Sequence, residues 1–405
     1  MKIACLIGSL TLGGAERQLI GLALALKREG HDVELLTYRK GTFYEEEVRQ
    51  LGIPHTTLKK YTRGQLIVSM ARYLKRSGCD LLISFLVSAN RKACLAHMLY
   101  PGFRLIVSER DFSGRVHLHD RIHFALYRQA ERVVCNNFSQ EAFLRSHFPK
   151  LSDRLETIPN FVDTQRFHPG DGPSAPASPI RVITTARVCR RKNTLGLIEA
   201  AALLKELPIR FDWYGLVREN GYYRRCLRRI AQLGLEGRFC LHIAQHEVAP
   251  LYRSADIFCL PSFHEGTSNS LAEALASGLP AAVSAVSDNP RYVHEGVNGA
   301  LFHPALSASI AEAVTRIASL PVEERTAYGL RGRESVCSAL SPESFAESWS
   351  ALLVLLRPQD QQGQAGEHDG EDHSLVADAM LPEEKGAEYE GNDHGSPPHE
   401  GNDRK

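Results

Sequence analysis

Two glutamates stand at a spacing that could do chemistry. Glu265 and Glu273 are separated by seven residues and follow the apolar run Asp256–Pro261, which predicts a buried strand. Glu265 lies in the loop after this run and Glu273 about one turn inside a following helix, so both carboxylates should face the same side. Because carboxylates accept hydrogen bonds from hydroxyl groups, the pair could hold a sugar or a ribose. Alternatively, Glu265 is a turn residue and Glu273 a solvated helix charge.

The residues between the glutamates predict the start of that helix. Ser268 and Asn269 are both favourable N-cap residues. The backbone N–H groups of Gly266, Thr267 and Ser268 would then lie at a helix N-terminus, where they favour an anion such as a phosphate. The same segment could therefore bind a phosphate and a sugar attached to it.

A second group of chemically competent residues is cationic. The segment Arg187-Val-Cys-Arg-Arg-Lys192 carries four cations in six residues directly after another apolar run. Folding alone does not require so many cations at the end of a buried strand, although a solvated basic loop is the alternative. Arg187 offers a planar fork of donors and Lys192 a point charge, and together they suit a diphosphate.

The first loop of the chain is rich in glycine. Gly13 and Gly14 follow the first apolar run and precede a predicted helix at Glu16–Glu29. Glycine lets the backbone approach a ligand closely, and the helix start offers N–H groups. The spacing is not G-x-G-x-x-G and no acidic residue ends the next strand, which argues against a nicotinamide oxidoreductase. An ordinary tight turn would explain the same residues.

Strands and helices must bring these loops together. Short apolar runs alternate with helical stretches along most of the chain, and most runs are continuously apolar, as in parallel strands covered on both faces. The sequence therefore predicts doubly wound α/β domains, whose ligands bind at the carboxyl ends of the strands. The first series of predicted strands is Lys2–Gly8, Val33–Tyr38, Leu81–Leu86, Arg104–Ser108, Arg132–Asn136 and Leu155–Pro159; the second is Arg181–Ala186, Arg210–Gly215, Arg238–Ile243, Asp256–Pro261, Ala281–Val286 and Ala300–His303.

A stretch without apolar periodicity divides the two series. His168–Ile180 is rich in Pro, Gly, Ser and Ala, so we place a linker at 169–179 between an N-terminal domain at 1–168 and a C-terminal domain at 180–340. Two facing Rossmann-like domains imply a cleft. A Ser-Pro-Glu start and an apolar stripe predict a terminal helix at 341–357, which should dock on the body.

The charge balance separates the tail from the body. Residues 358–405 contain 13 acidic and 3 basic side chains and few large apolar ones, so we expect a disordered acidic tail. Since the whole chain has a net charge of +1, residues 1–357 carry about +11. This moderately basic body suits anionic ligands or an anionic membrane surface, whereas the overall balance argues against a histone-like protein, and we expect no nucleic-acid partner.

Two further features favour a cytoplasmic protein. No run of about 18 apolar residues occurs, and the opening Met1–Gly14 is interpreted as a buried strand and loop rather than a signal peptide. The nine cysteines are an odd number, none is spaced C-x-x-C and most lie in apolar runs, which favours reduced core thiols.

Several stretches, taken together, resemble one family. They are GGAE at 13–16, IPNFVDTQRFHP at 158–169, TARVCRRKN at 185–193, GLEGRFCLHI at 234–243, LYRSADIFCLPS at 251–262, the Glu265–Glu273 pair and GVNGALFHP at 296–304. This ordered series resembles the retaining glycosyltransferases of the family-4 type, which have the two-domain GT-B fold and an E-x7-E signature. The resemblance covers nearly all of residues 1–357 and leaves the tail outside.

The resemblance implies a role for each matching residue. Arg187 and Lys192 would bind the diphosphate of a nucleotide-sugar, and Gly14 would approach its phosphates. Glu265 would contact the donor sugar as a catalytic residue, and Glu273 would hold the ribose. The donor-binding set is then Gly14, Arg187, Lys192, Gly266, Thr267, Ser268, Asn269 and Glu273.

The implied reaction moves a sugar with retention, from a donor expected to be UDP-linked, to a cell-envelope glycan or a lipid-linked acceptor. Such reactions serve polysaccharide and lipopolysaccharide biosynthesis. No D-x-D motif occurs in the chain, so we expect no metal and no other cofactor. Arg187 and Lys192 would supply the positive charge instead.

One stretch departs from the family pattern. Many relatives have a histidine after the fourth strand of the N-terminal domain, near the reacting sugar, whereas this chain has Ser108-Glu109-Arg110-Asp111. Glu109 or Arg110 could replace that histidine as a catalytic group, and a local ion pair is the alternative. The β-phosphate of the leaving diphosphate could take the acceptor's proton. Three histidines follow and are expected to be structural: His117, His119 and His123.

The acceptor is expected on the N-terminal domain. Basic residues surround the apolar run Leu66–Met70, and this surface could contact the inner face of a membrane, with an ordinary solvated helix as the alternative. These residues are Lys59, Lys60, Arg63, Arg72, Lys75 and Arg76.

Two other hypotheses remain. A GT-B-fold epimerase or hydrolase of sugar nucleotides would turn over the donor without an acceptor, and a non-catalytic scaffold would act through the tail. The presence of Glu265, Glu273, Arg187 and Lys192 disfavours the scaffold.

Overall fold

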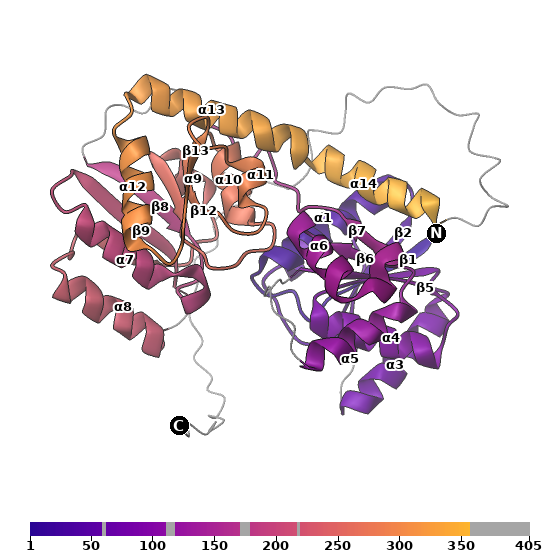
Figure 1. Cartoon of the computed structure of the whole chain (residues 1–405). Coiled ribbons are helices and arrows are strands. Elements are labelled where there is room, and N and C mark those ends of the chain that lie inside the picture. Colours follow the sequence, from indigo (N-terminus) through magenta and orange to yellow (C-terminus); the bar gives the residue numbers. More distant parts are fainter. Residues whose placement is uncertain (59–61, 111–117, 171–178, 217–218, 357–405) are drawn as a thin grey trace, which may run out of the picture. The chain divides into compact units, whose positions relative to one another are not determined.

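The computed structural model describes residues 1–58, 62–110, 118–170, 179–216 and 219–356, and Figure 1 shows the course of the chain. The predicted tail at 358–405 and most of the predicted linker lie outside these residues. The described residues form two parallel sheets, each with helices on both faces. The predicted doubly wound α/β architecture is confirmed.

The first sheet defines what we call the N-terminal lobe. Its seven strands run in the order β3-β2-β1-β4-β5-β6-β7, and every neighbouring pair is parallel. The chain order reverses between β1 and β4, so the loop after β1 opens where such sheets bind ligands. The strands are β1 (Lys2–Leu6), β2 (Asp32–Thr37), β3 (His55–Thr57), β4 (Leu81–Phe85), β5 (Arg104–Glu109), β6 (Arg132–Cys135) and β7 (Leu155–Thr157).

The second sheet defines the C-terminal lobe. Its six strands run in the order β10-β9-β8-β11-β12-β13, again all parallel. Here the order reverses between β8 and β11, which places the loops after these two strands side by side. The strands are β8 (Ile180–Thr185), β9 (Ile209–Leu216), β10 (Phe239–Ile243), β11 (Ile257–Leu260), β12 (Ala281–Ser284) and β13 (Gly299–Phe302).

All the predicted strands coincide with observed strands, but β3 was not predicted. This strand has three residues and pairs with β2 alone, at the edge of the sheet. Its side chains are polar: the Thr37 hydroxyl lies 2.9 Å from both His55 Nε2 and Thr57 Oγ1. Because hydrogen bonds replace an apolar stripe here, periodicity gives no signal.

The helices of the N-terminal lobe form two layers. One layer, α1 and α2, packs on the face with Ile3, Leu35 and Ile83; the other, α3 to α6, packs on the opposite face with Leu82 and Val107. The helices are α1 (Gly14–Arg28), α2 (Glu45–Gln50), α3 (Arg63–Ser77), α4 (Val87–Leu99), α5 (Leu118–Leu126) and α6 (Phe138–His147).

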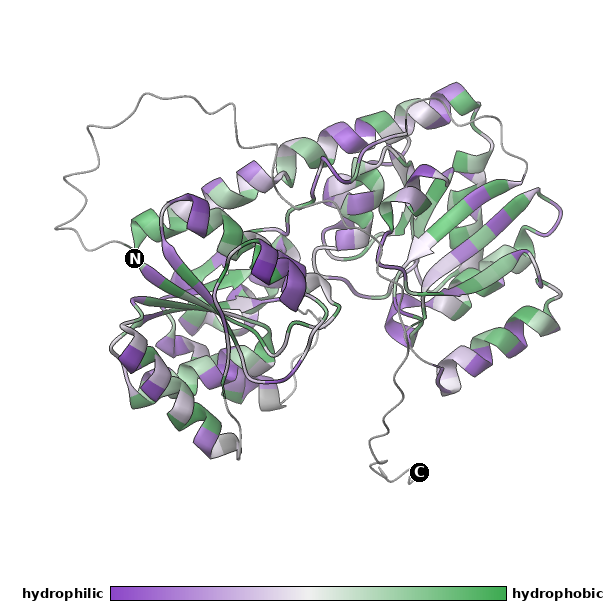
Figure 2. Ribbon diagram, turned by 180° about the vertical axis from the view of Figure 1, so that it is seen from behind, coloured by the Kyte–Doolittle hydropathy of each residue, from purple (hydrophilic) through white to green (hydrophobic). Residues whose placement is uncertain are grey.

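The C-terminal lobe is layered in the same way. Helices α7, α8 and α12 cover one face, and α9 to α11 with α13 cover the other. In Figure 2 many helices are banded in green and purple, the pattern of elements that bury one face only. They are α7 (Thr194–Leu203), α8 (Gly221–Gln232), α9 (Ala249–Arg253), α10 (Asn269–Ala276), α11 (Asn289–Tyr292), α12 (Ser307–Ala318) and α13 (Val322–Ala339).

The predicted terminal helix returns to the N-terminal lobe. This helix, α14 (Pro342–Leu355), is capped by Ser341, whose side chain accepts a hydrogen bond from the Ser344 N–H (3.1 Å). Its apolar stripe joins the core beside α1, and Trp349 stacks on Phe85 with ring centroids 6.2 Å apart. The N-terminal lobe is therefore completed by the end of the described chain.

Replacing Trp349 by alanine should destabilise the protein by about 3–5 kcal/mol, because a fully buried aromatic side chain leaves a cavity. Urea unfolding followed by circular dichroism measures the loss. Leu355→Ala is the matched control on the same helix: its side chain is exposed, so the change should be within about 0.5 kcal/mol. Equal losses in both variants would contradict the docking of α14.

Candidate functional site

The loop after β8 meets the loop after β11. Lys192 ends a 3₁₀ turn, η3 (Arg190–Lys192), and its ammonium lies 2.6 Å from Oε1 of Glu265. The Phe263 N–H donates to the Arg191 carbonyl (2.9 Å), which ties the two loops together. Both charges are withdrawn from water, since Glu265 is 4% exposed and the Lys192 side chain 13%. Two candidate residues far apart in sequence are thus brought together.

Glu273 is also buried against a cation, and this cation comes from the other lobe. Arg17, in the first turn of α1, forms an ion pair with Oε1 of Glu273, and the Tyr252 hydroxyl donates to Oε2 at 3.1 Å. Burial favours a lower pKa for Arg17, but neighbouring groups, chiefly the Glu273 carboxylate, raise its pKa above the ordinary value. Burial and then Glu273 raise the pKa of Tyr252. Glu273 is 7% exposed and is therefore not a solvated helix charge.

The start of α10 has the N-cap that the sequence predicts. The Ser268 side chain accepts a hydrogen bond from the Leu271 N–H (3.4 Å), and the helix begins at Asn269. Gly14 of the N-terminal lobe lies against this helix start: a Cβ on Gly14 would collide with Nδ2 of Asn269. A larger residue at position 14 would have to displace the Asn269 amide.

Further contacts hold the loop before α10 against the N-terminal lobe. The Thr267 hydroxyl donates to the Asn136 carbonyl, and the Asn160 amide donates to Oδ1 of Asn269 at 2.7 Å. A Cβ on Gly266 would lie 3.1 Å from Oδ1 of Asn136, so the loop approaches the other lobe closely. Part of the predicted donor-binding set therefore lies where the two lobes touch: Gly14, Gly266, Thr267, Asn269 and Glu273.

Arg187 is the least engaged of the predicted site residues. It lies two residues after the end of β8, and its side chain is exposed. Nothing in the described chain forms a hydrogen bond or an ion pair with its guanidinium. Its charge is therefore available to an anion.

Arg110 is a partly buried cation near the contact between the lobes. Its Nε donates to the Ser108 hydroxyl (2.9 Å), its Nη1 donates to Oδ1 of Asn160, and its guanidinium lies 3.9 Å from the Phe85 ring centroid. Its Nη2 has no hydrogen-bond partner among the described residues. Burial lowers the pKa of Arg110 to about 9, with a smaller opposing effect of Cys135, so the side chain is cationic at neutral pH.

Glu109 lies inside the N-terminal lobe. It is 1% exposed, and its Oε1 accepts hydrogen bonds from the Tyr127 hydroxyl and, at 3.4 Å, from Asn90 Nδ2. Burial and then Glu109 raise the pKa of Tyr127. Arg110 is linked to the C-terminal lobe through Asn160, which donates to Asn269. By contrast, the Tyr127 and Asn90 donors to Glu109 belong to its own lobe. The catalytic roles of Arg110 and Glu109 stay predictions.

The three downstream histidines are placed only in part. His123 on α5 is buried, and its Nδ1 lies 3.6 Å from Oδ1 of Asp120. His117 and the side chain of His119 lie outside the described residues.

One group in the described chain has side chains that suit a metal ion. Asp212 on β9 lies near Cys240 and His242 on β10. However, Arg181 Nε and Arg210 Nη2 already contact this carboxylate at 2.8 and 3.1 Å, and His242 Nε2 lies 2.7 Å away. Two arginines compensate the charge of Asp212 and would repel a cation, so these residues do not fit a metal.

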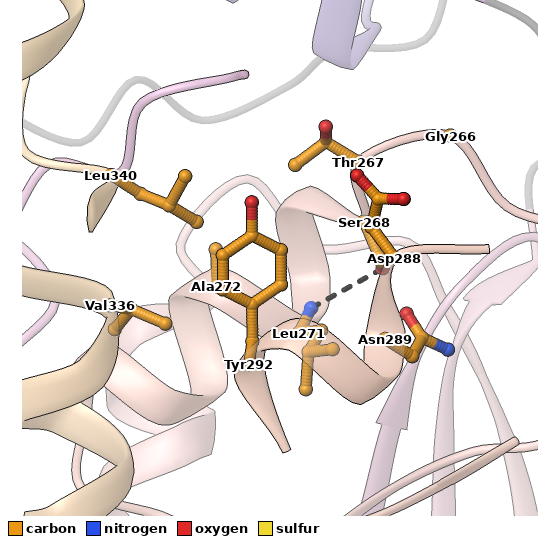
Figure 3. A pocket seen from close by; sticks show the side chains of 10 residues that line it. All are labelled: Gly266, Thr267, Ser268, Leu271, Ala272, Asp288, Asn289, Tyr292, Val336 and Leu340. Atoms are coloured by element: carbon orange, nitrogen blue, oxygen red, sulfur yellow. Dashed lines mark hydrogen bonds between the residues drawn. The ribbon is translucent and has the colours of Figure 1, made fainter. Parts of the chain in front are cut away.

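A small hollow lies beside the start of α10. Its empty space measures about 240 Å³, and Figure 3 shows Asp288 and Tyr292 beside residues 266–268. The residues that line it are Gly266, Thr267, Ser268, Leu271, Ala272, Asp288, Asn289, Tyr292, Val336 and Leu340. It does not include the Lys192–Glu265 pair, so we do not assign the donor to it.

Sequence reasoning missed three polar residues of the site. Arg17 directly follows the GGAE turn, and Tyr252 and Asn160 lie within stretches that carried the family resemblance. The signal was present, but a residue type does not tell which partner it meets. Only the contact between the lobes pairs Arg17 with Glu273.

Comparisons with protein families agree with the fold. A model described as Glycosyltransferase Family 4 matches residues 12–166, and a model described as Glycosyl transferases group 1 matches residues 179–319. The two matches fall one on each lobe, in chain order.

Among curated relatives, a galactosaminyltransferase of Campylobacter jejuni, named for an undecaprenol-linked substrate, is 29% identical over 68% of this chain and 77% of its own. The lipopolysaccharide core biosynthesis glycosyltransferase LpsE of Rhizobium meliloti is 25% identical over 84% and 96%. The solved structure of Anabaena HepE with UDP-glucose has a TM-score of 0.76 at 19% identity and covers 87% of this chain and 99% of its own. This likeness identifies the GT-B fold.

Lys192→Met should cost about 3 kcal/mol of stability, because it leaves the Glu265 carboxylate buried without its cation. The double variant Lys192→Met and Glu265→Gln should lose less stability than the sum of the losses in the two single variants. Urea unfolding measures all three. The exposed pair Arg229–Glu199 provides the control, and Arg229→Met should cause a much smaller loss. Additive losses at 192 and 265 would show that the pair does not interact.

Proposed function

Because the chain belongs to the group 1 glycosyltransferases, we propose that it transfers a sugar, with retention, from a UDP-linked donor to a lipid-linked glycan of the cell envelope. The observation that carries this proposal is the meeting of Lys192 with Glu265 in the loops that follow β8 and β11. Arg187, which is exposed, belongs to the same loop as Lys192. Cations for a diphosphate and a carboxylate for sugar hydroxyls lie at one place.

The charges suit the chemistry of the transfer. Breaking the bond between the sugar and the diphosphate leaves additional negative charge on the leaving group. Cations already in place stabilise that charge, an effect typically worth several kcal/mol. Lys192 and Arg187 would supply these positive charges without a metal ion. When the donor binds, Lys192 exchanges Glu265 for a phosphate, and Glu265 exchanges Lys192 for sugar hydroxyls.

Glu273 suits the ribose of the donor. Arg17 and Tyr252 engage one oxygen each, and a carboxylate has about four acceptor positions. Lone pairs therefore remain for the ribose hydroxyls while Arg17 compensates the charge.

The choice of donor and acceptor rests on relatives. HepE is described in complex with UDP and with UDP-glucose, which supports a UDP-linked donor here. The Campylobacter relative is named for an undecaprenol-linked substrate and the Rhizobium relative for the lipopolysaccharide core. These names support an acceptor of the cell envelope that is carried by a lipid.

Incubation with a panel of nucleotide-sugars should show release of UDP from one donor. Glu265→Ala and Lys192→Ala should each lower this release by at least about 100-fold, because each removes a group that contacts the donor. Glu206→Ala, at an exposed site on the same lobe, is the control and should keep wild-type turnover. A chelator should change nothing.

The outcome also separates the alternatives. UDP release that does not require an acceptor would favour an epimerase or a hydrolase. Wild-type release by both site variants would overturn the assignment of the site. Nuclear magnetic resonance of the product's anomeric proton tests retention.

We also propose that the outer face of α3, α4 and α5 contacts an anionic membrane. These helices and the 3₁₀ turn η1 (Tyr127–Gln129) contain eight Lys and Arg residues but one acidic residue, Asp120. Lys75 lies 5.7 Å from the Tyr100 ring centroid, so the ends of α3 and α4 are adjacent. Exposed members of this face are Val68, Arg72, Lys75, Arg76, Arg91, Met98, Leu99, Arg121, Ile122 and Arg128.

Positive charge next to exposed apolar side chains suits the interface of an anionic bilayer. Among the described residues, none of the helices has the length and hydropathy of a membrane span. Of the basic residues first expected to form this surface, Lys59, Lys60 and the side chain of Arg63 lie outside the described residues.

The double variant Lys75→Glu and Arg76→Glu should bind phosphatidylglycerol-containing vesicles at least about tenfold more weakly than wild type, since each basic residue near such a surface contributes about 1 kcal/mol. Co-sedimentation measures the binding. Lys205→Glu, an exposed change on the C-terminal lobe, should have little effect. Equal binding by the double variant and wild type would contradict this contact.

A further inference from the structure

The turn between β12 and α11 contacts the N-terminal lobe. Its residue Asp288 is 3% exposed, and its carboxylate accepts three hydrogen bonds from the start of α6. The donors are the Phe138 N–H (2.7 Å), the Ser139 N–H (3.0 Å) and the Ser139 hydroxyl (2.6 Å). A carboxylate is favourable at a helix N-terminus because it meets unpaired N–H groups and the positive end of the helix dipole. Asp288 thus caps a helix of the other lobe.

The preceding residue contacts the loop of Glu265. Ser287 has φ +49°, in the left-handed region that residues other than glycine seldom adopt. Its hydroxyl donates to the Glu265 carbonyl at 2.8 Å. Such a conformation persists only when the surroundings fix it, and it often marks a functional site.

The Ser287 hydroxyl is not needed to close the turn. The Val286 backbone N–H and the Asn289 side-chain amide both donate to the Ser284 carbonyl, at 2.8 and 3.0 Å. The Asn289 N–H donates to the Val286 carbonyl at 3.1 Å. The turn is therefore held by its own hydrogen bonds, and the Ser287 hydroxyl reaches outward to the Glu265 loop.

The same segment of the N-terminal lobe contacts that loop a second time. Asn136, two residues before α6, accepts from the Thr267 hydroxyl and lies against Gly266. Residues 136–139 therefore contact the Glu265 loop directly and, through Asp288 and Ser287, indirectly. A shift of α6 relative to the C-terminal lobe would disturb both contacts.

We propose that Ser287 and Asp288 are positioning residues that couple the contact between the lobes to the placement of Glu265. The turn keeps its shape through its own hydrogen bonds, and the docking of Asp288 on α6 fixes its position. From that position the Ser287 hydroxyl restrains the Glu265 backbone. When the lobes separate, Asp288 leaves α6 and this restraint on Glu265 weakens. The catalytic consequence rests on the proposed function, but the structural coupling does not.

Hydrogen–deuterium exchange of the full-length protein tests the coupling without any substrate. Asp288→Asn should speed exchange about tenfold in residues 136–141, because Phe138 and Ser139 lose a charged acceptor, and also in residues 263–268. Ser287→Gly should speed exchange in 263–268 alone. Because glycine adopts positive φ without strain, this variant should keep or raise the melting temperature. Ser341→Ala, which removes the cap of α14, is the control and should leave 263–268 unchanged.

Turnover provides the second measurement. Ser287→Gly should lower kcat for UDP release about tenfold while the Kd for UDP stays close to wild type, because Glu265 is misplaced but the diphosphate contacts remain. A merely structural role for Ser287 predicts an unchanged kcat in a protein of equal or higher stability, and that result would overturn the proposal. So would unchanged exchange at 263–268 in Asp288→Asn. If wild-type protein releases UDP from no donor, the proposed function fails, and the exchange result still decides the coupling.

Discussion

A carboxylate withdrawn from water needs a cation, and this requirement organises the site. Glu265 is paired with Lys192 of its own lobe, whereas Glu273 is paired with Arg17 of the other lobe. Leaving either carboxylate without its cation would be costly, since the surroundings cannot replace water. A ligand with a diphosphate and free hydroxyls carries both an anion for the cations and donors for the carboxylates. Such a ligand can therefore replace these pairs without leaving a buried charge uncompensated.

The two sheets contribute differently to this arrangement. In the C-terminal lobe, the reversal of strand order between β8 and β11 brings the two charged loops together, so the Lys192–Glu265 pair forms within one lobe. The N-terminal lobe contributes Arg17, Gly14 and Asn160, which meet α10 from outside. Part of the site therefore exists within one lobe, and the rest depends on contact between the lobes.

Arg110 extends the polar contacts into the N-terminal lobe. Asn160 accepts from Arg110 and donates to Asn269, so a short relay runs from the end of β5 to the start of α10. The Arg110 guanidinium lies over the Phe85 ring, and its buried Nη2 has no hydrogen-bond partner among the described residues. Helix α14 supports the same region, because the Trp349 ring stacks on the Phe85 ring. The last described helix thus supports the N-terminal lobe.

The sequence by itself determined the local features: the apolar runs became strands, Ser268 became the N-cap of α10, and Ser341 that of α14. These features depend on interactions between near neighbours in the chain, which residue type and spacing describe. The polar edge strand β3 was not predictable, because side-chain hydrogen bonds rather than an apolar stripe hold it. Neither was the pairing of Arg17 with Glu273 or of Asp288 with α6, residues far apart in the chain. Only the tertiary structure decided these partners, because the energy of a charge depends on what surrounds it after folding, and a list of residues does not contain that environment.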